Sequence, residues 1–232
     1  MNTNNQNKAG LVPSQTSALS PSGVTSLVRR GRQDLIAKAE AEQWCNQGRA
    51  LWRRQQYGEA VECFRHGLQL DPNHVELQFL LGAAYHQGNG LPERDHTQAA
   101  LWYRRAAEQG LPAAQALLGM MYEWSWGVPQ DYSQAAEWYR KAAEQGHAGA
   151  GYVLGCCYWV GRGVPRNYAQ ACAWFRKAAD QGDASAANNL AVCYERGLGV
   201  PHDREQAVQW YGKAAELGFE AARAALAILS TK

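Results

Sequence analysis

Residues 150–182 read AGYVLGCCYWVGRGVPRNYAQACAWFRKAADQG, and the chain repeats this stretch every 36 residues. The aromatic pair near its end returns in the same register in the neighbouring units. The four pairs are Trp102-Tyr103, Trp138-Tyr139, Trp174-Phe175 and Trp210-Tyr211. A period of this length is typical of stacked supersecondary units that share one continuous core. The repeat therefore predicts a solenoid rather than a single globular core.

The first half of each unit carries small or apolar residues at every fourth position. In the quoted unit these are Ala150, Leu154 and Tyr158, which lie along one face of a helix. Gly155 follows the leucine, and a mid-helix glycine costs about 1 kcal/mol relative to alanine. We therefore expect a neighbouring helix to cross closely at that glycine. A glycine-bearing turn before proline, residues 161–165, then reverses the chain.

The second half of each unit begins with a helix start signal. Asn167 is followed three residues later by Gln170, which predicts a capping box in which each side chain bonds the other residue's backbone N–H. The four predicted caps are Asp95, Asp131, Asn167 and Asp203. A stripe of alanine and tryptophan follows each cap, and a closing glycine is suited to the helix end. Each unit is thus predicted as helix–turn–helix, with the repeated tryptophan in the core.

The pattern A-x-x-x-L-G-x-x-Y-x-x-G-x-G-V-P, followed by D-x-x-x-A-x-x-W-Y-x-K-A-A-x-Q-G, resembles the Sel-one-like repeat (SLR), a relative of the tetratricopeptide repeat. The resemblance covers four units over residues 75–218. Residues 41–74 resemble one tetratricopeptide unit, with Trp44, Gly48 and Pro72 at positions that this repeat prefers. The resemblance implies an all-α fold, a right-handed α-solenoid of helix–turn–helix repeats.

The segments outside the repeats have distinct compositions. Residues 1–22 are rich in Asn, Ser, Pro and Gln, which predicts a disordered polar tail. Residues 23–40 contain three arginines and are predicted to form a basic leading helix. Residues 219–232 are predicted to form a C-terminal capping helix that covers the apolar end of the stack.

Charge and motifs argue against several classes of function. The net charge is +2 with acids and bases interleaved, which does not favour nucleic acid as a partner. We find no apolar stretch long enough for a membrane span and no signal-peptide pattern, so we expect a cytoplasmic protein. A periplasmic location, or secretion by a non-classical route, is the alternative. The scattered histidines and the helix-bound G-x-G turns predict no metal, no cofactor and no catalytic residue.

The six cysteines stand at positions 45, 63, 156, 157, 172 and 193. Cysteine-rich SLR proteins carry pairs eight residues apart within each unit, and no two cysteines here have that spacing. We therefore expect reduced thiols. The resemblance still leaves one alternative, a secreted or periplasmic enzyme of the cysteine-rich kind, related to β-lactams or the cell wall. A self-assembling structural component is a second alternative.

In tetratricopeptide-like stacks the first helix of each unit lines a concave face that binds peptides of partner proteins. The resemblance therefore implies a non-enzymatic interaction module, an adaptor or scaffold of bacterial type, whose partner is a protein or peptide. The oligomeric state is open, with a monomer favoured. The implied groove residues are Phe79, Met120, Trp124, Tyr152, Trp159, Asn188, Arg196, Arg49 and Arg53.

The tryptophans sharpen this hypothesis. No repeat position requires Trp124 or Trp159, and large aromatic side chains commonly anchor a bound partner. The alternative is that both pack internally. Trp126 stands in a turn where glycine is expected, and we predict a structural role for it. Phe79 and Tyr152 are further apolar anchors, while the three arginines are expected to steer charged groups.

Overall fold

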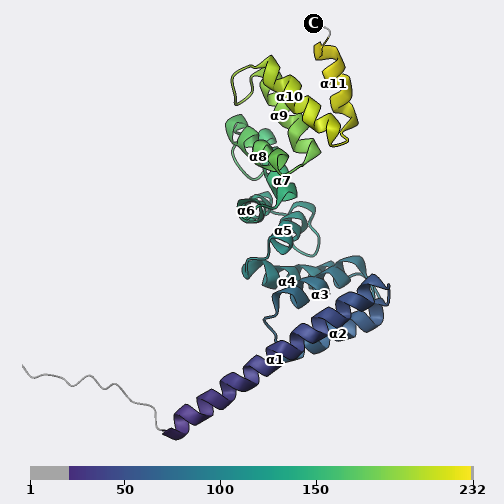
Figure 1. Cartoon of the computed structure of the whole chain (residues 1–232), viewed down its shortest axis with the longest axis vertical. Helices are drawn as coiled ribbons and strands as arrows, with labels where there is room; N and C mark the ends of the chain where they lie inside the picture. Colours follow the sequence, from purple (N-terminus) through teal and green to yellow (C-terminus); the bar gives the residue numbers. More distant parts are fainter. Residues whose placement is uncertain (1–20, 231–232) are drawn as a thin grey trace, which may run out of the picture.

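The computed structural model describes residues 21–230, with side chains described for residues 29–229. Within this range it has eleven helices and no strand. They are α1 (Pro21–Arg53), α2 (Tyr57–Leu70), α3 (Val75–Gln87), α4 (His96–Glu108), α5 (Pro112–Trp124), α6 (Tyr132–Glu144), α7 (Ala148–Val160), α8 (Tyr168–Asp180), α9 (Ala184–Arg196), α10 (Arg204–Glu216) and α11 (Glu220–Ser230). Figure 1 shows them stacked in chain order, which confirms the all-α solenoid.

The longest helix, α1, joins two predicted segments in one element. It runs without a break through the leading segment and the first helix of the tetratricopeptide unit, and its N-terminal half projects past α2 (Figure 1). Leu35 and Ile36 on this projection are 70% and 50% exposed. The predicted tail over residues 1–22 lies outside the described residues, apart from the two with which α1 begins. No helix in residues 21–230 is both long and apolar enough to cross a membrane.

The close helix crossing predicted at the mid-helix glycine is present. Ala150 and Leu154 of α7 are buried. The next helix, α8, crosses α7 at Gly155. A Cβ atom at Gly155 would lie 2.5 Å from Cε1 of Phe175. The glycine therefore lets the ring of α8 pack against the α7 backbone. Each helix packs mainly on its neighbours in sequence, so one continuous core runs from unit to unit along the stack.

The repeated aromatic pair packs differently from the prediction. The second residue of each pair is buried, namely Tyr103, Tyr139, Phe175 and Tyr211. Of the four tryptophans only Trp174 is buried, so the predicted core position is wrong for Trp102, Trp138 and Trp210, which are half-buried. The second residue faces the crossing glycine, and the tryptophan lies about 100° around the helix from it. A basic side chain three residues on covers each indole, as where Lys141 Nζ lies 4.1 Å from the Trp138 ring.

Half of each predicted capping box is observed. Asn167 Oδ1 accepts from the backbone N–H of Gln170 at 3.1 Å, and the three aspartates make the same bond. The other half of the prediction is wrong, because the backbone N–H of the cap residue does not donate to the glutamine side chain. The N–H of Asn167 instead donates to the carbonyl of Tyr158 at 2.9 Å, because the turn brings the last turn of the first helix alongside. The cap thus ties the two helices of the unit together.

The glycine-bearing turns serve packing between units. Gly127 has φ of +69°, and a Cβ atom there would lie 2.1 Å from the carbonyl oxygen of His96 at the start of α4. The turn therefore rests on the backbone of the preceding unit, which confirms the structural interpretation of the G-x-G pattern. Ser125 takes the place of the first turn glycine with φ of +56°, and its hydroxyl donates to the carbonyl of Val128.

Candidate functional site

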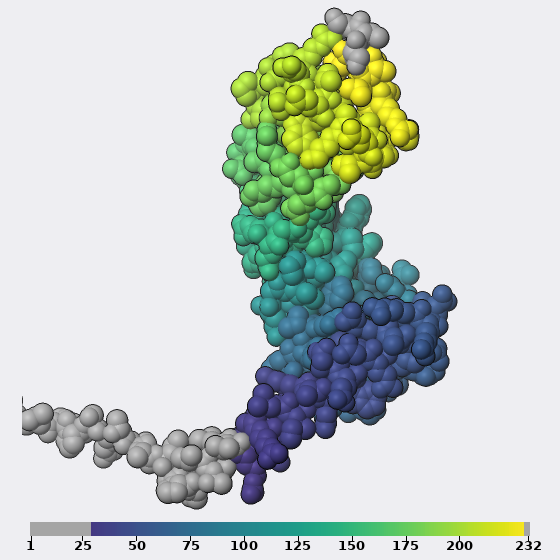
Figure 2. All heavy atoms as spheres, viewed as in Figure 1, coloured from purple at the N-terminus to yellow at the C-terminus, as the bar shows by residue number. Residues whose placement is uncertain are grey.

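The first helices of the four repeats, α3, α5, α7 and α9, occupy equivalent positions in successive units. We call their exposed side the first-helix surface. Figure 2 shows the outline of the stack indented between the N-terminal helices and α11. The residue six positions after the repeat leucine is exposed in every unit: Gln87, Trp124, Val160 and Arg196. Trp124 and Val160 are 58% and 62% exposed, so two neighbouring units present large apolar side chains at one position.

Three of the predicted aromatic anchors pack against second helices. Trp159 lies 5.0 Å from the Tyr168 ring and 6.1 Å from the Phe175 ring. Tyr152 is also 6.1 Å from Phe175, and Phe79 packs 5.7 Å from Tyr103 in the same manner. All three are half-buried. Much of their ring area is thus already engaged within the stack, and their contact with a partner stays a prediction.

The two tryptophans at the end of α5 differ in environment. Trp126 is half-buried, stacked on His96 at 5.5 Å and tilted against His86 at 5.4 Å, which confirms its structural role. Trp124 lies 6.5 Å from Trp126 on the outer side of this cluster. Trp124 is therefore the predicted anchor whose ring remains most open to solvent.

Met120 lines an apolar cleft between α5 and α7, which we call the α5–α7 cleft. Its volume is about 440 Å³. Its lining residues are Ala113, Ala116, Leu117, Met120, Tyr139, His147, Gly149, Ala150 and Val153. Tyr139 comes from α6, the helix between the two first helices. An apolar cleft of this size with few polar groups is the form that binding sites commonly take.

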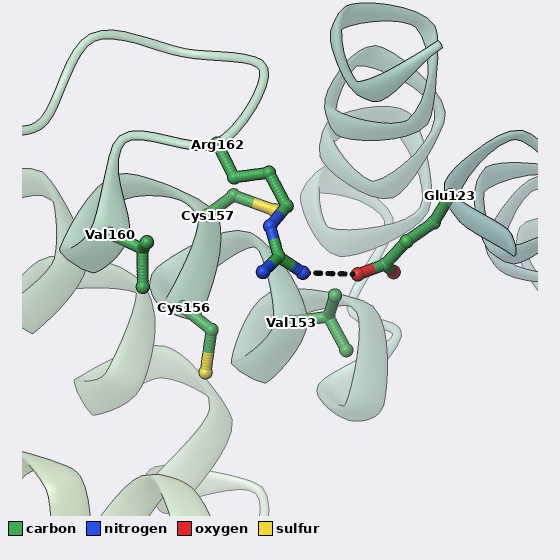
Figure 3. Close-up of a pocket in the computed structure, with 6 residues that line it drawn as sticks. All are labelled: Glu123, Val153, Cys156, Cys157, Val160 and Arg162. Carbon is green, nitrogen blue, oxygen red and sulfur yellow. Dashed lines mark hydrogen bonds and ion pairs between the residues drawn. The ribbon is translucent and has the colours of Figure 1, made fainter. Parts of the chain in front are cut away.

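A smaller hollow of about 90 Å³ adjoins the cleft, because Val153 lines both. Figure 3 shows Arg162 reaching from the turn after α7 towards Glu123 of α5. The guanidinium lies 3.3 Å from the Glu123 carboxylate, which also accepts a hydrogen bond from the Tyr139 phenol at 2.8 Å. These contacts join the C-terminal end of α5 to the turn after α7.

The predicted polar groove residues are spread along the chain. Arg49 forms an ion pair with Glu76 at 3.0 Å. Arg53 and Arg196 are exposed, and among the described residues neither has a carboxylate within ion-pair distance. The amide of Asn188 donates to Asn189 at 3.4 Å. Of the nine predicted groove residues, Met120 lines the cleft. Trp124 is the last residue of the same helix, α5.

The cleft also contains residues that the prediction missed. Leu117 and Val153 stand one position before the repeat leucine, and Gly149 stands five positions before it. The sequence does carry a signal for Gly149, because the first unit has a longer side chain, that of Glu76, at the same position. Whether a missing side chain opens a cleft depends on the facing helix, which the sequence of one unit does not specify.

The groups around the cleft are poorly suited to covalent chemistry. Burial raises the pKa of the Cys157 thiol to about 12, and burial with the hydrogen bond to Glu123 raises the pKa of the Tyr139 phenol far above its ordinary value. Within the described residues, no group of three His, Cys, Asp or Glu side chains is arranged to hold a metal ion. The arrangement offers contact area and a few hydrogen bonds.

Comparison with known proteins agrees with this architecture. The Sel1 repeat family matches residues 75–111, 112–147, 150–183 and 184–219, and the tetratricopeptide repeat matches residues 41–74. No curated protein matches the chain significantly.

Solved structures show the same repeats. A Sel1 repeat protein from Oxalobacter formigenes is 36% identical with a TM-score of 0.74, over 79% of this chain and 74% of that one. A protective antigen of uropathogenic Escherichia coli strains that displays an SLR fold is 34% identical with a TM-score of 0.77, over 86% of this chain. This chain spans only 43% of the length of that antigen. MamA, at 21% identity and a TM-score of 0.51 over 76% of this chain and 96% of its own, shares the fold alone. The chain therefore belongs to the Sel1 repeat family, with one tetratricopeptide unit ahead of its four Sel1 repeats.

Proposed function

We propose that the protein is a non-enzymatic interaction module that binds a segment of a partner protein in the α5–α7 cleft. One observation carries the proposal: the cleft is open, apolar and about 440 Å³ in volume, and it lies on the first-helix surface. Repeats of this fold are typically protein-interaction modules. The chemistry of the cleft fits contact with a peptide better than it fits a reaction.

The binding residues in this proposal come from two sources. Met120 and Trp124 are groove residues that the resemblance to tetratricopeptide-like stacks implies, and the structure leaves both accessible. Leu117 and Val153 add apolar area inside the cleft, and Val160 lines the adjoining hollow. Phe79, Tyr152 and Trp159 support the second helices in this proposal, while Arg53 and Arg196 are free to meet charged groups elsewhere along the stack.

A selection from a displayed random-peptide library tests the proposal. We expect the full chain to enrich apolar peptides, and we expect Met120→Glu combined with Val153→Glu to abolish their binding, because each places a carboxylate in an apolar lining. Leu101→Glu is the matched control, since Leu101 is 46% exposed on α4, a second helix. Enriched peptides that bind the double variant as well as the wild type would contradict the site.

We also propose a reducing, cytoplasmic environment for the module. All six cysteines are free thiols in the structure, and five of them are buried. Free buried thiols are typical of proteins kept under reducing conditions. An enzyme of the cysteine-rich kind requires a disulfide framework. Titration of the free thiols distinguishes such an enzyme from the proposed module.

A further inference from the structure

Two histidines of this chain have the same role at the start of a first helix. His74 precedes α3 and His147 precedes α7, and each stands eight residues before the glycine of its helix, Gly82 or Gly155. Nδ1 of His147 accepts from the backbone N–H of Ala150 at 3.1 Å, as Nδ1 of His74 does from α3 at 3.3 Å. Because Nδ1 is an acceptor, the ring proton is on Nε2, which is left to donate.

The earlier junction, between α1 and α3, shows what this donor binds. Nε2 of His74 lies 3.0 Å from the carboxylate of Glu42 on α1. Arg49 of α1 lies 3.0 Å from Glu76 of α3 in the same junction. A histidine–carboxylate hydrogen bond and an ion pair therefore join the first helices of these neighbouring units.

The junction of α5 and α7 has the same histidine, but uncharged residues stand at the positions of Glu42, Arg49 and Glu76. Ala113 stands six residues before Gly119, where Glu42 stands six before Gly48. Met120 takes the position of Arg49, and Gly149 takes the position of Glu76. Ala113, Met120 and Gly149 all line the α5–α7 cleft together with His147. The cleft is thus the space that charged side chains occupy at the junction of α1 and α3, two junctions earlier.

The imidazole of His147 is accessible in this space. It is half-buried, and a Cβ atom at Gly149 would lie 3.6 Å from its Cε1 atom, so the missing side chain leaves the ring open. Within residues 29–229 no side chain accepts a hydrogen bond from Nε2 of His147. None of the lining residues is acidic, and the nearby Glu123 is held by Tyr139 and Arg162.

We propose that the α5–α7 cleft binds a partner segment that places a carboxylate on Nε2 of His147 and an apolar side chain against Leu117, Met120 and Val153. The inference rests on the proposed function and names the chemistry of its ligand. The carboxylate takes the place that Glu42 holds at His74, and the N-terminus of α7 favours its negative charge. We assign this carboxylate to an Asp or Glu side chain of the segment, because a Glu side chain binds the equivalent histidine, His74.

The test uses peptides selected from the displayed library and resynthesised as separate probes. One probe keeps its acidic side chain, a second replaces it with the amide, and a third carries an amidated C-terminus. We expect the probe with the side-chain amide to bind the wild-type chain about tenfold more weakly, by fluorescence anisotropy. A loss of affinity confined to the probe with the amidated C-terminus would overturn the assignment to a side chain.

Two variants locate the effect at His147. His147→Asn keeps a side chain that caps α7 and removes the Nε2 donor, so the preference for the acidic probe should disappear. Ala113→Glu supplies an internal carboxylate, as Glu42 does, and should weaken the acidic probe about tenfold. If His147→Asn fails to fold, Ala113→Glu decides the question alone. Helical content by circular dichroism checks both variants.

The outcomes separate this inference from the proposed function. Peptides that require Met120 and Val153 but bind equally well as acid and amide would overturn the carboxylate site and leave the cleft as a binding site. An acid preference that survives both variants would also overturn it. If the wild-type chain enriches no peptide, the proposed function fails and the inference fails with it.

Discussion

The phenol of Tyr139 donates a hydrogen bond to Glu123, 2.8 Å away, and joins the second helix of the unit to the end of its first helix. Tyr211 and Glu195 repeat this bond at 2.6 Å in the last unit. In the unit between them, phenylalanine replaces the tyrosine at 175 and tryptophan replaces the glutamate at 159. A ring pair at 6.1 Å thus replaces a hydrogen bond, so in these three units the residues at the two positions match each other.

The pairing at 159 and 175 predicts different roles for the two unassigned tryptophans. Trp159→Ala removes a half-buried ring and should lower the free energy of unfolding by about 2 kcal/mol. Trp124→Ala removes an exposed ring and should change it by less than about 0.5 kcal/mol. Urea unfolding followed by circular dichroism measures both. Equal losses would show that Trp124 is also part of the core.

The bond between Tyr139 and Glu123 should have a measurable effect on stability. Tyr139→Phe leaves the largely buried carboxylate with Arg162 alone, and we expect a loss of about 1–2 kcal/mol. Phe175→Tyr adds a buried hydroxyl opposite Trp159, which has no acceptor, and should also destabilise the protein. Thermal unfolding tests both variants. A stabilising Phe175→Tyr would contradict the matched positions.

The close crossing at Gly155 predicts that the same substitution has opposite effects at two glycines. Gly155→Ala places a Cβ atom 2.5 Å from Phe175 and should cost about 1–3 kcal/mol through overpacking. Gly212 lies inside α10, and apart from its chain neighbours and the adjacent helix backbone no atom lies within 4 Å of an added Cβ atom. Gly212→Ala should therefore stabilise the protein by about 0.5–1 kcal/mol. Melting temperatures that shift in the same direction would contradict the packing argument.

His86 predicts a loss of stability in acid. Burial, with the neighbouring His96 and Arg94, lowers the pKa of His86 below its ordinary value of 6.5. A group whose pKa is lower in the folded state stabilises the fold above its ordinary pKa, and this contribution is lost as the pH falls below that value. The free energy of unfolding should thus decrease between about pH 7 and about pH 5. His86→Gln should reduce that decrease, and an unchanged pH dependence would contradict the role of His86.

The thiols predict the behaviour of the protein during purification. Burial is the main cause that raises the pKa of Cys45 and Cys157 to about 12, so at about pH 8 these thiols are protonated and react slowly in the native state. After purification in air and unfolding in denaturant, we expect all six cysteines to react with a thiol reagent. Fewer than six would support the alternative of a cysteine-rich enzyme.

The repeat register and the helix ends could be predicted from the sequence because they depend on nearby residues. The four caps bond a backbone N–H three residues away, and the closing glycines adopt positive φ at the ends of their own helices. Such interactions are complete within one turn of helix. The assignment of the fold required only this local information and the 36-residue period.

Tertiary structure decided which side chains of the pattern became core and which became site. Tyr139 is buried and Trp138 is half-buried because α5 crosses α6 at Gly119, and an amphipathic stripe alone does not distinguish two adjacent aromatic residues. The α5–α7 cleft likewise depends on Ala113 and His147 facing each other across two units. The sequence determined the stack through short-range bonds and periodicity, while the packing of one unit on the next determined where the stack is open.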